Sequence, residues 1–101
     1  MKLTIARSAR DDLLEIRDYY QAQGLSGVGL RLVNEVLSCI ERLAIHPDSG
    51  RKVPEFDDDS LREIILSPFR VVYLRHPDQI SLIRVWRSER VLHLPDETPE
   101  N

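Results

Sequence analysis

Residues 61–90, LREIILSPFRVVYLRHPDQISLIRVWRSER, decide the fold of this chain. They form three short runs rich in Val, Ile, Leu and Tyr, which are separated by Ser67-Pro68 and by His76-Pro77-Asp78. Apolar runs of this length, broken by turn residues, are typical of strands joined by tight connections. The stretch therefore predicts an antiparallel meander. Its strands are expected at about residues 60–66, 69–76 and 79–87.

A first helix is predicted near the N-terminus. Apolar side chains between Leu13 and Tyr20 recur at helical spacing and fall on one face. Ser8 is interpreted as a cap at the start of this helix, and Gly24 as the residue that ends it. We therefore expect a helix at about residues 9–23.

A second helix follows after a linker of two or three residues. A long apolar stripe at intervals of three or four residues predicts it at about 27–45, capped by Ser26 and stopped before Pro47. A linker this short forces the two helices into an antiparallel hairpin. Residues 2–6 alternate as a short strand does. The predicted fold class is α+β, in the order β-α-α-β-β-β, with the N-terminal strand and the hairpin packed on one face of a small, mainly antiparallel sheet.

Length and charge narrow the class of protein. A chain of 101 residues corresponds to one domain, which we place at residues 1–94, with a short strand or turn at 91–94 and a disordered acidic tail at 95–101. The formal net charge of −3 argues against a general nucleic-acid binder, which carries a basic footprint. No signal peptide is recognised, and no apolar run approaches the roughly 20 residues that a membrane span needs. The expectation is a cytoplasmic protein without a membrane partner.

Residue types that carry common catalytic chemistry are sparse. The three histidines are scattered, without the spacing of a zinc site, and Cys39 lies in the apolar stripe of the second predicted helix. The acidic run 57–59 is interpreted as a solvated loop, because a hard cation needs several oxygens in a fixed geometry. There is no glycine-rich phosphate loop. No metal and no cofactor are therefore predicted.

Alternation along the last two predicted strands leaves neither strand with a fully polar face. Strict alternation places Tyr73 and Arg75 on one side of their strand, and Arg84 and Trp86 on one side of theirs. Because the hairpin covers one side of the sheet, the other side either lies under the chain's own C-terminal segment or waits for a partner. Apolar surface mixed with Arg, Tyr and Trp has the composition of a protein interface. We therefore predict that these four residues bind a partner.

Arginines are concentrated in the predicted sheet, at Arg62, Arg70, Arg75, Arg84, Arg87 and Arg90. Arginines clamp phosphates and stabilise charge during phosphoryl transfer. A metal-free nuclease also needs a proton acceptor, for which His93 is the candidate nearest to the cluster in sequence. The alternative is that the guanidinium groups form surface ion pairs, for example Arg62 with Glu55 or Glu63.

The chain resembles the toxins of bacterial type II toxin–antitoxin pairs, of the RelE/ParE superfamily. The resemblance covers residues 2 to about 93, and the ordered set is more specific than any single piece. The residues that match the superfamily pattern follow one another along the chain. They are Ser8, Asp12, Leu13, Ile16 and Tyr19 in the first predicted helix; Leu43, Pro47, Gly50-Arg51 and Pro54-Glu55 after it; and Arg62-Glu63-Ile64, Phe69-Arg70-Val71-Val72-Tyr73 and the strand 80–85 with a basic segment after it in the meander.

The superfamily divides into two activities. RelE-like members cut messenger RNA in the ribosome with a Lys/Arg cluster and a late Tyr or His, and the resemblance places such a set at Arg62, Arg70, Arg87, Arg90 and His93. ParE-like members share the fold, inhibit DNA gyrase and lack the nuclease set. In this chain Ile64 stands where a second lysine is expected, and Ser88 where an arginine is expected. The ParE-like branch is therefore favoured.

The resemblance implies a toxin that inhibits growth by binding DNA gyrase, contributes to plasmid stabilisation and is neutralised by a cognate antitoxin. The antitoxin is expected to lie across the helical hairpin and the open face of the sheet. Residues 86–90 stand where ParE-like chains carry a His-Gly-Arg-Arg type segment, of which Arg90 matches. Two alternatives remain: a RelE-like endoribonuclease that acts on messenger RNA in the ribosome, and a member that binds only its antitoxin. In the favoured interpretation the chain is a binding protein rather than an enzyme, and the toxin alone does not recognise a DNA sequence.

Overall fold

The computed structural model of the chain describes residues 1–88 and 94–95. Its elements are β1 (Lys2–Ile5), α1 (Arg7–Ala22), α2 (Ser26–Ile45), β2 (Arg51–Lys52), β3 (Leu61–Leu66), β4 (Phe69–Arg75) and β5 (Gln79–Arg87). The five strands form one sheet in the order β1-β5-β4-β3-β2, in which β1 runs parallel to β5 and the other neighbours are antiparallel. The predicted α+β fold is confirmed, and β2 is a short strand that the sequence did not reveal.

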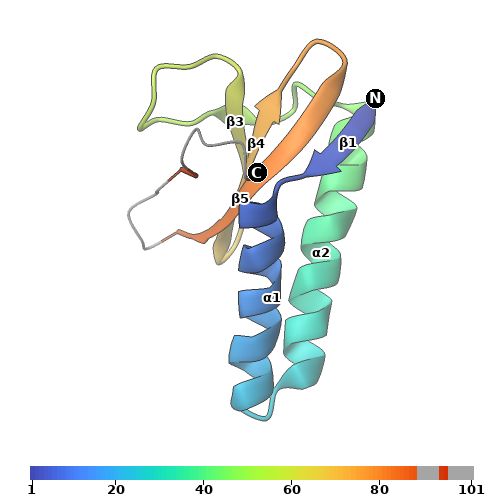
Figure 1. The fold of residues 1–101 in the computed structure, drawn as a ribbon, viewed down its shortest axis with the longest axis vertical. Helices are drawn as coiled ribbons and strands as arrows, with labels where there is room; N and C mark the ends of the chain where they lie inside the picture. The colour runs from blue at the N-terminus through green and yellow to red at the C-terminus, as the bar shows by residue number, and fades with distance from the viewer. Residues whose placement is uncertain (89–93, 96–101) are drawn as a thin grey trace.

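The helical hairpin lies on one side of the sheet and extends past its lower end in Figure 1. Gly24 has a φ of +73° in the turn between the helices, a conformation that an L side chain rarely adopts, so it ends α1 as predicted. Both predicted helix caps are wrong, because neither serine occupies the N-cap position of its helix. Ser8 lies inside α1, where its hydroxyl donates to the Ile83 carbonyl oxygen at 2.6 Å, and Ser26 is the first residue of α2.

A β-bulge in β5 changes which side chains face the helices. Val72 pairs with Arg84 and Tyr73 pairs with Leu82, so Ile83 is an extra residue in β5. The extra residue reverses the alternation beyond it. Strict alternation had placed Trp86 on the same side as Leu82, whereas Val85 now follows Leu82 in the helix-facing cluster. The sequence analysis assumed strict alternation along β5. Part of the mixture of polar and apolar residues that it inferred on each face therefore results from the bulge, which it did not take into account.

Both sides of the sheet carry a hydrophobic cluster. The larger cluster joins the helices to residues such as Phe69, Val71 and Tyr73. The smaller one lies on the opposite side of the sheet. It is built from Val53, Leu61, Val72 and Ile83, with Phe56, Leu74, Trp86 and Leu94 packed against it. The second side is therefore covered in part by the segment after β2 and by Leu94. The sequence analysis had considered only the C-terminal segment for this role, and of that segment the structure places Leu94 on the cluster.

Some predictions fall outside the described residues. Arg90 and His93 do so, as do the greater part of the expected strand or turn at 91–94 and of the disordered tail at 95–101. Within the described part, no helix is long and apolar enough to cross a membrane.

Candidate functional site

Tyr73 is a core residue and is not exposed to a partner. Its side chain is fully buried, and its hydroxyl donates to the Pro47 carbonyl oxygen at 3.0 Å and accepts the Gly50 N–H at 3.0 Å. Burial raises the pKa of Tyr73, so the hydroxyl stays protonated. The prediction that Tyr73 lies on an open surface is wrong, because its face of the sheet is the one that packs on the helices.

Arg75 is half-buried at the end of β4. Its Nε donates to Asp48 Oδ1 at 2.9 Å, and its Nη1 donates to the carbonyl oxygen of His76. Asp48 belongs to the same turn as Pro47, which holds the Tyr73 hydroxyl. Arg75 therefore ties the turn after α2 to the end of β4, and the predicted role in partner binding remains a prediction.

Arg84 and Trp86 lie at the junction of β5 and α1. The Asp12 carboxylate accepts hydrogen bonds from Arg84 Nε at 2.8 Å, from Arg84 Nη2 at 2.9 Å and from the Val85 N–H at 2.9 Å. The Arg84 guanidinium also lies 4.1 Å from the centroid of the Trp86 ring, which is a cation–π contact. Asp12 is only 8% exposed, so this is a buried cross-link between a helix and a strand.

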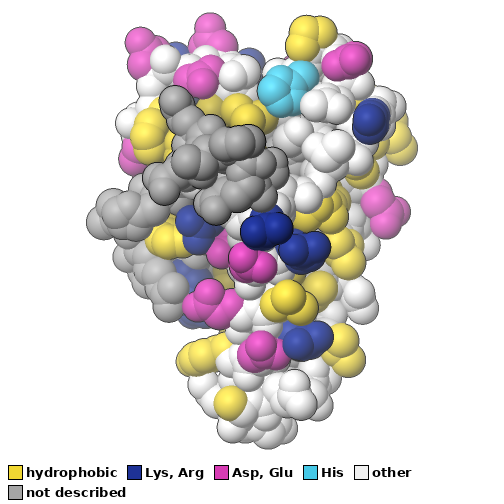
Figure 2. All heavy atoms as spheres, viewed as in Figure 1, with side chains coloured by type: hydrophobic (Ala, Val, Ile, Leu, Met, Phe, Trp, Pro, Cys, Tyr) yellow, Lys and Arg dark blue, Asp and Glu magenta, His cyan; other side chains and the backbone are white. Residues whose placement is uncertain are grey.

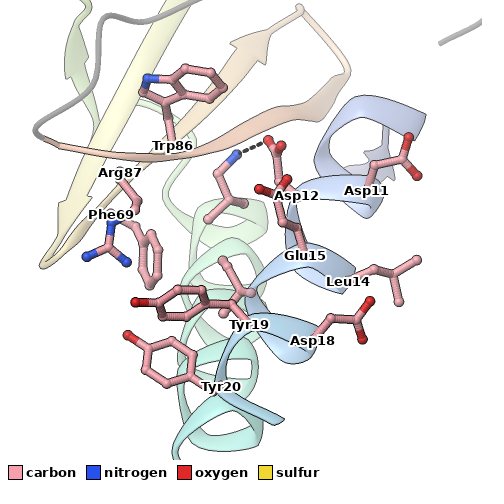
Figure 3. A pocket seen from close by; sticks show the side chains of 12 residues that line it. Asp11, Asp12, Leu14, Glu15, Asp18, Tyr19, Tyr20, Phe69, Trp86 and Arg87 are labelled. Atoms are coloured by element: carbon pink, nitrogen blue, oxygen red, sulfur yellow. Dashed lines mark hydrogen bonds between the residues drawn. The ribbon is translucent and has the colours of Figure 1, made fainter. Parts of the chain in front are cut away.

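A groove lies between α1 and the end of β5 (Figure 3). It exists because β1 pairs only with Gln79–Leu82, so the last residues of β5 have α1 rather than a strand beside them. We call it the α1–β5 groove; its volume is about 800 Å³. Its lining residues are Asp11, Asp12, Leu14, Glu15, Ile16, Asp18, Tyr19, Tyr20, Phe69, Val85, Trp86 and Arg87.

Sequence reasoning missed this groove. The aromatic floor combines Phe69 from β4 with Tyr20, whose ring meets that of Tyr19 edge to face at a centroid distance of 5.1 Å. Trp86 extends to the opposite side of β5 from Phe69 and Arg87 in Figure 3. A signal was present in the sequence: α1 carries more acids and aromatics than its apolar stripe needs. Only the packing of α1 against β5 places them around one hollow.

Arg70 is engaged by two carboxylates on the second side of the sheet. Its Nε donates to Glu63 Oε1 at 2.6 Å, and its Nη1 and Nη2 donate to Glu55 at 2.6 and 2.7 Å. Glu63 is 1% exposed and also accepts from Arg51 Nε at 2.8 Å. The hydrogen bonds that Arg70 donates to Glu55 raise the pKa of Arg70 and lower the pKa of Glu55.

A family model of the "ParE toxin of type II toxin-antitoxin system, parDE" matches residues 3–92. That match spans most of the chain. This chain belongs to the ParE toxin family. A solved chain described as "Chromosomal ParDE TA system from P. aeruginosa" shares the fold, with a TM-score of 0.74 and 24% sequence identity over 88% of this chain and 97% of that chain. The comparison with curated proteins found no match.

Membership in the ParE family makes the chain the toxin of a type II toxin–antitoxin system and implies a ParD antitoxin as its partner. The predicted superfamily and the favoured branch are thereby confirmed. Among the described residues of this ParE toxin, no group of three or more His, Cys, Asp and Glu side chains is arranged to hold a metal ion.

Of the residues predicted for a nuclease set, the three that the structure describes, Arg62, Arg70 and Arg87, are not brought together in this ParE toxin. Arg62 donates to the carbonyl oxygens of Asp59 at 2.7 Å and Gly50 at 3.3 Å. Arg87 lies 5.8 Å from the Phe69 ring centroid, on the helix side, whereas Arg70 is on the opposite side of the sheet. The predicted pairing of Arg62 with Glu55 or Glu63 is wrong, because Arg70 takes both carboxylates.

Proposed function

We propose that this ParE toxin inhibits growth by binding DNA gyrase and that it does not cleave RNA. The observation that supports the proposal is the position of Arg70. A nuclease needs guanidinium groups that turn toward a phosphate, whereas Arg70 is 7% exposed and bonded to Glu55 and Glu63. Redirecting Arg70 to a phosphate would leave the buried Glu63 short of a partner, which is costly.

The surface of the toxin also fits a protein target better than a nucleic acid. Acidic, basic and hydrophobic side chains are interspersed over the exposed face of α1, without a continuous basic patch on the face shown in Figure 2. The formal net charge of the chain is −3. A chain that neutralises phosphates carries clustered positive charge, so direct binding of DNA or messenger RNA by the toxin alone is not part of the proposal.

A supercoiling assay tests the gyrase target. Relaxed plasmid, ATP and purified gyrase are mixed with increasing amounts of the toxin, and the supercoiled product is quantified. We expect the product to fall as the toxin reaches a molar excess, and to return when the ParD antitoxin is added first. Unchanged supercoiling at toxin excess would exclude gyrase as the target.

A translation assay provides the matching control for the alternative activity. Translating ribosomes loaded with a defined messenger are incubated with the same toxin preparation, and the messenger is mapped by primer extension. We expect no new cleavage site. Cleavage that depends on the toxin would instead establish the RelE-like endoribonuclease.

The proposal extends to the molecular context of the toxin. We propose that residues 1–94 act as one domain, that the toxin acts in the cytoplasm, and that ParD neutralises it by covering part of its surface. Because the chain shields the second side of its own sheet, the antitoxin surface is proposed on the helix side rather than on an open sheet face. Growth that continues when the toxin is produced without ParD would favour the alternative in which this chain binds only its antitoxin.

A further inference from the structure

We infer that this toxin contacts DNA gyrase through the end of its helical hairpin, which docks into a gyrase cleft lined by apolar and uncharged polar groups. The contact surface is residues 19–30, which we call the hairpin tip. It comprises the end of α1, the turn at Gly24 and the start of α2. This assignment rests on the proposed inhibition of gyrase and adds the toxin surface and the chemistry of the surface that receives it.

The hairpin tip carries no charge. Its sequence, YYQAQGLSGVGL, is a run of twelve residues without Asp, Glu, Lys or Arg, although these four types make up 31% of the chain. The next longest such run, 64–69, has six residues. Figure 2 shows only hydrophobic and uncharged side chains at the lower end of the molecule on that face. Soluble domains normally keep their surfaces charged, whereas the central part of a protein interface is depleted of charge.

The hairpin tip is also open to its surroundings. It belongs to the part of the hairpin that extends past the lower end of the sheet in Figure 1, so the sheet does not cover it. Tyr19 is 53% exposed, Leu25 is 46% exposed and Leu30 is 56% exposed. A single exposed apolar side chain is normal on a protein surface. Three of them within one uncharged segment are typical of a surface that a partner covers.

Backbone contacts hold the hairpin tip in one shape. The Leu25 N–H donates to the Tyr20 carbonyl oxygen at 2.8 Å, and the Gly24 N–H donates to the Gln21 carbonyl oxygen at 3.0 Å. A Cβ at Gly29 would lie 3.1 Å from Tyr20 Cβ, so the glycine lets α2 approach α1 closely. A surface that is ordered before binding loses little conformational entropy when its partner arrives.

The charged residues that border the hairpin tip are paired within their own helices. Asp18 binds Arg17 at 3.0 Å, and Arg31 binds Glu35 at 3.3 Å. Neither border therefore presents an unbalanced charge that would attract a partner of one sign. Shape and apolar contact, rather than charge, select what binds to this surface.

These properties favour gyrase over the other possible occupants. DNA is disfavoured because a phosphate backbone needs cations, which residues 19–30 do not supply. A second copy of the toxin would meet this one tip to tip, and two projecting ends share little contact area. An antitoxin segment that becomes ordered on binding suits a groove rather than a projection. A projecting, uncharged element is complementary to a cleft of a large folded enzyme, since such clefts are concave and mostly apolar.

A matched pair of substitutions on α2 tests the contact. Leu30→Lys introduces a positive charge into the hairpin tip, whereas Ile45→Lys introduces the same charge at the opposite end of α2, where Ile45 is 73% exposed. The toxin concentration that halves gyrase supercoiling is measured for each variant. We expect this concentration to rise more than roughly tenfold for Leu30→Lys, because its ammonium group would be buried without a partner, and to stay unchanged for Ile45→Lys. Thermal unfolding of each variant is recorded to verify the fold.

The salt dependence of binding tests the chemistry of the cleft. The affinity of the wild-type toxin for gyrase is measured by calorimetry at two salt concentrations, one low and one physiological. An uncharged contact predicts a change in affinity of less than roughly threefold, because salt screens only charged groups. A steep loss of affinity with added salt would show a charged interface and would overturn the inference.

The supercoiling assay separates this inference from the proposed function. If the wild-type toxin inhibits gyrase and folded Leu30→Lys inhibits it equally well, the inference fails while the gyrase target stands. If the wild-type toxin does not inhibit gyrase at all, the proposed function fails and the inference fails with it. Unchanged gyrase inhibition with weakened ParD binding by Leu30→Lys would assign the hairpin tip to the antitoxin. Self-association of the wild-type toxin that Leu30→Lys abolishes, measured by sedimentation, would assign it to a second copy. Either of these last two results would also overturn the inference.

Discussion

Tyr73 packs as a core residue because its hydroxyl reaches two backbone partners. A buried tyrosine needs such partners, since an unsatisfied hydroxyl costs free energy. Gly50 makes the arrangement possible: a Cβ at this position would meet the Tyr73 hydroxyl, Tyr73 Cε1 at 2.7 Å and the Glu63 carbonyl oxygen at 2.9 Å. The glycine is therefore required by close approach, although its φ is ordinary.

Replacing Gly50 with alanine should destabilise the fold. The added methyl group must push the Tyr73 ring or the backbone of β3, and overpacking of this kind costs about 1–3 kcal/mol. The free energy of unfolding, measured in urea, gives the change. Gly27→Ala is the matched control, because nothing lies within 4 Å of a Cβ there and alanine favours a helix. Equal stability of the two variants would contradict the close-approach argument.

At the scale of elements, the N-terminal part of α1 acts in place of a strand along the edge of β5. β1 pairs with β5 as far as Leu82, the Ser8 hydroxyl binds the Ile83 carbonyl oxygen, and Asp12 accepts the Val85 N–H. The bulge at Ile83 brings Arg84 within reach of the same carboxylate. The helix therefore satisfies an edge that would otherwise present open hydrogen-bonding groups.

Replacing Asp12 with asparagine should loosen this junction. The amide oxygen can still accept one hydrogen bond, but the partly buried Arg84 loses its counter-charge, so we expect a loss of about 3 kcal/mol in the free energy of unfolding. A double-mutant cycle with Arg84→Met isolates the pair. The double variant should be less destabilised than the sum of the two single variants. Strict additivity would show that Asp12 and Arg84 act independently.

At the scale of the whole molecule, the sheet separates two clusters, and the second is closed by the chain itself. Glu55 holds the segment after β2 to Arg70 on β4, while Leu94 packs against the same cluster. The result is a toxin whose second side is shielded before any partner arrives. This is why the antitoxin surface is proposed on the helix side.

Lowering the pH should weaken the contact between Glu55 and Arg70 on the second side of the sheet and so reduce the free energy of unfolding. Hydrogen bonds from Arg70 lower the pKa of Glu55 below its ordinary value of 4.5, so the charged form is favoured in the fold. Glu55 therefore contributes stability that is present above that value and is lost as the pH falls through the lower, folded-state pKa. Urea unfolding from pH 6 to pH 3 measures the decline. Glu55→Gln should be less stable at pH 6 and should show a smaller decline.

The strands could be predicted because local patterns specify them. Residues 61–90 contain three apolar runs and two breaks, and β3, β4 and β5 follow those runs closely. The helical hairpin follows in the same way from its apolar stripes and from Gly24. Positions that depend on distant partners were missed: Ser8 suits a cap by local sequence, yet its hydroxyl binds Ile83 on β5.

The candidate site was harder to predict than the fold. Arg62, Arg70 and Arg87 are close in the sequence of the meander, but register and pleat send Arg70 and Arg87 to opposite sides of the sheet. A buried tyrosine and an exposed one look alike in a strand pattern, so Tyr73 was assigned to the surface. The groove combines residues of α1 with residues roughly fifty or more positions later in the chain, so the surplus acids and aromatics of α1 did not reveal what they would face.

By itself, the sequence determined the order of the elements, the α+β class and the resemblance to ParE toxins, because periodicity, turn residues and ordered motifs act over short distances. Tertiary structure alone decided that one extra residue in β5 reverses the exposure of its end, that Glu55 and Glu63 bind Arg70, and that α1 and β5 enclose an acidic, aromatic groove. Those features depend on pairing across the sheet, where a shift of one residue exchanges the buried and exposed faces.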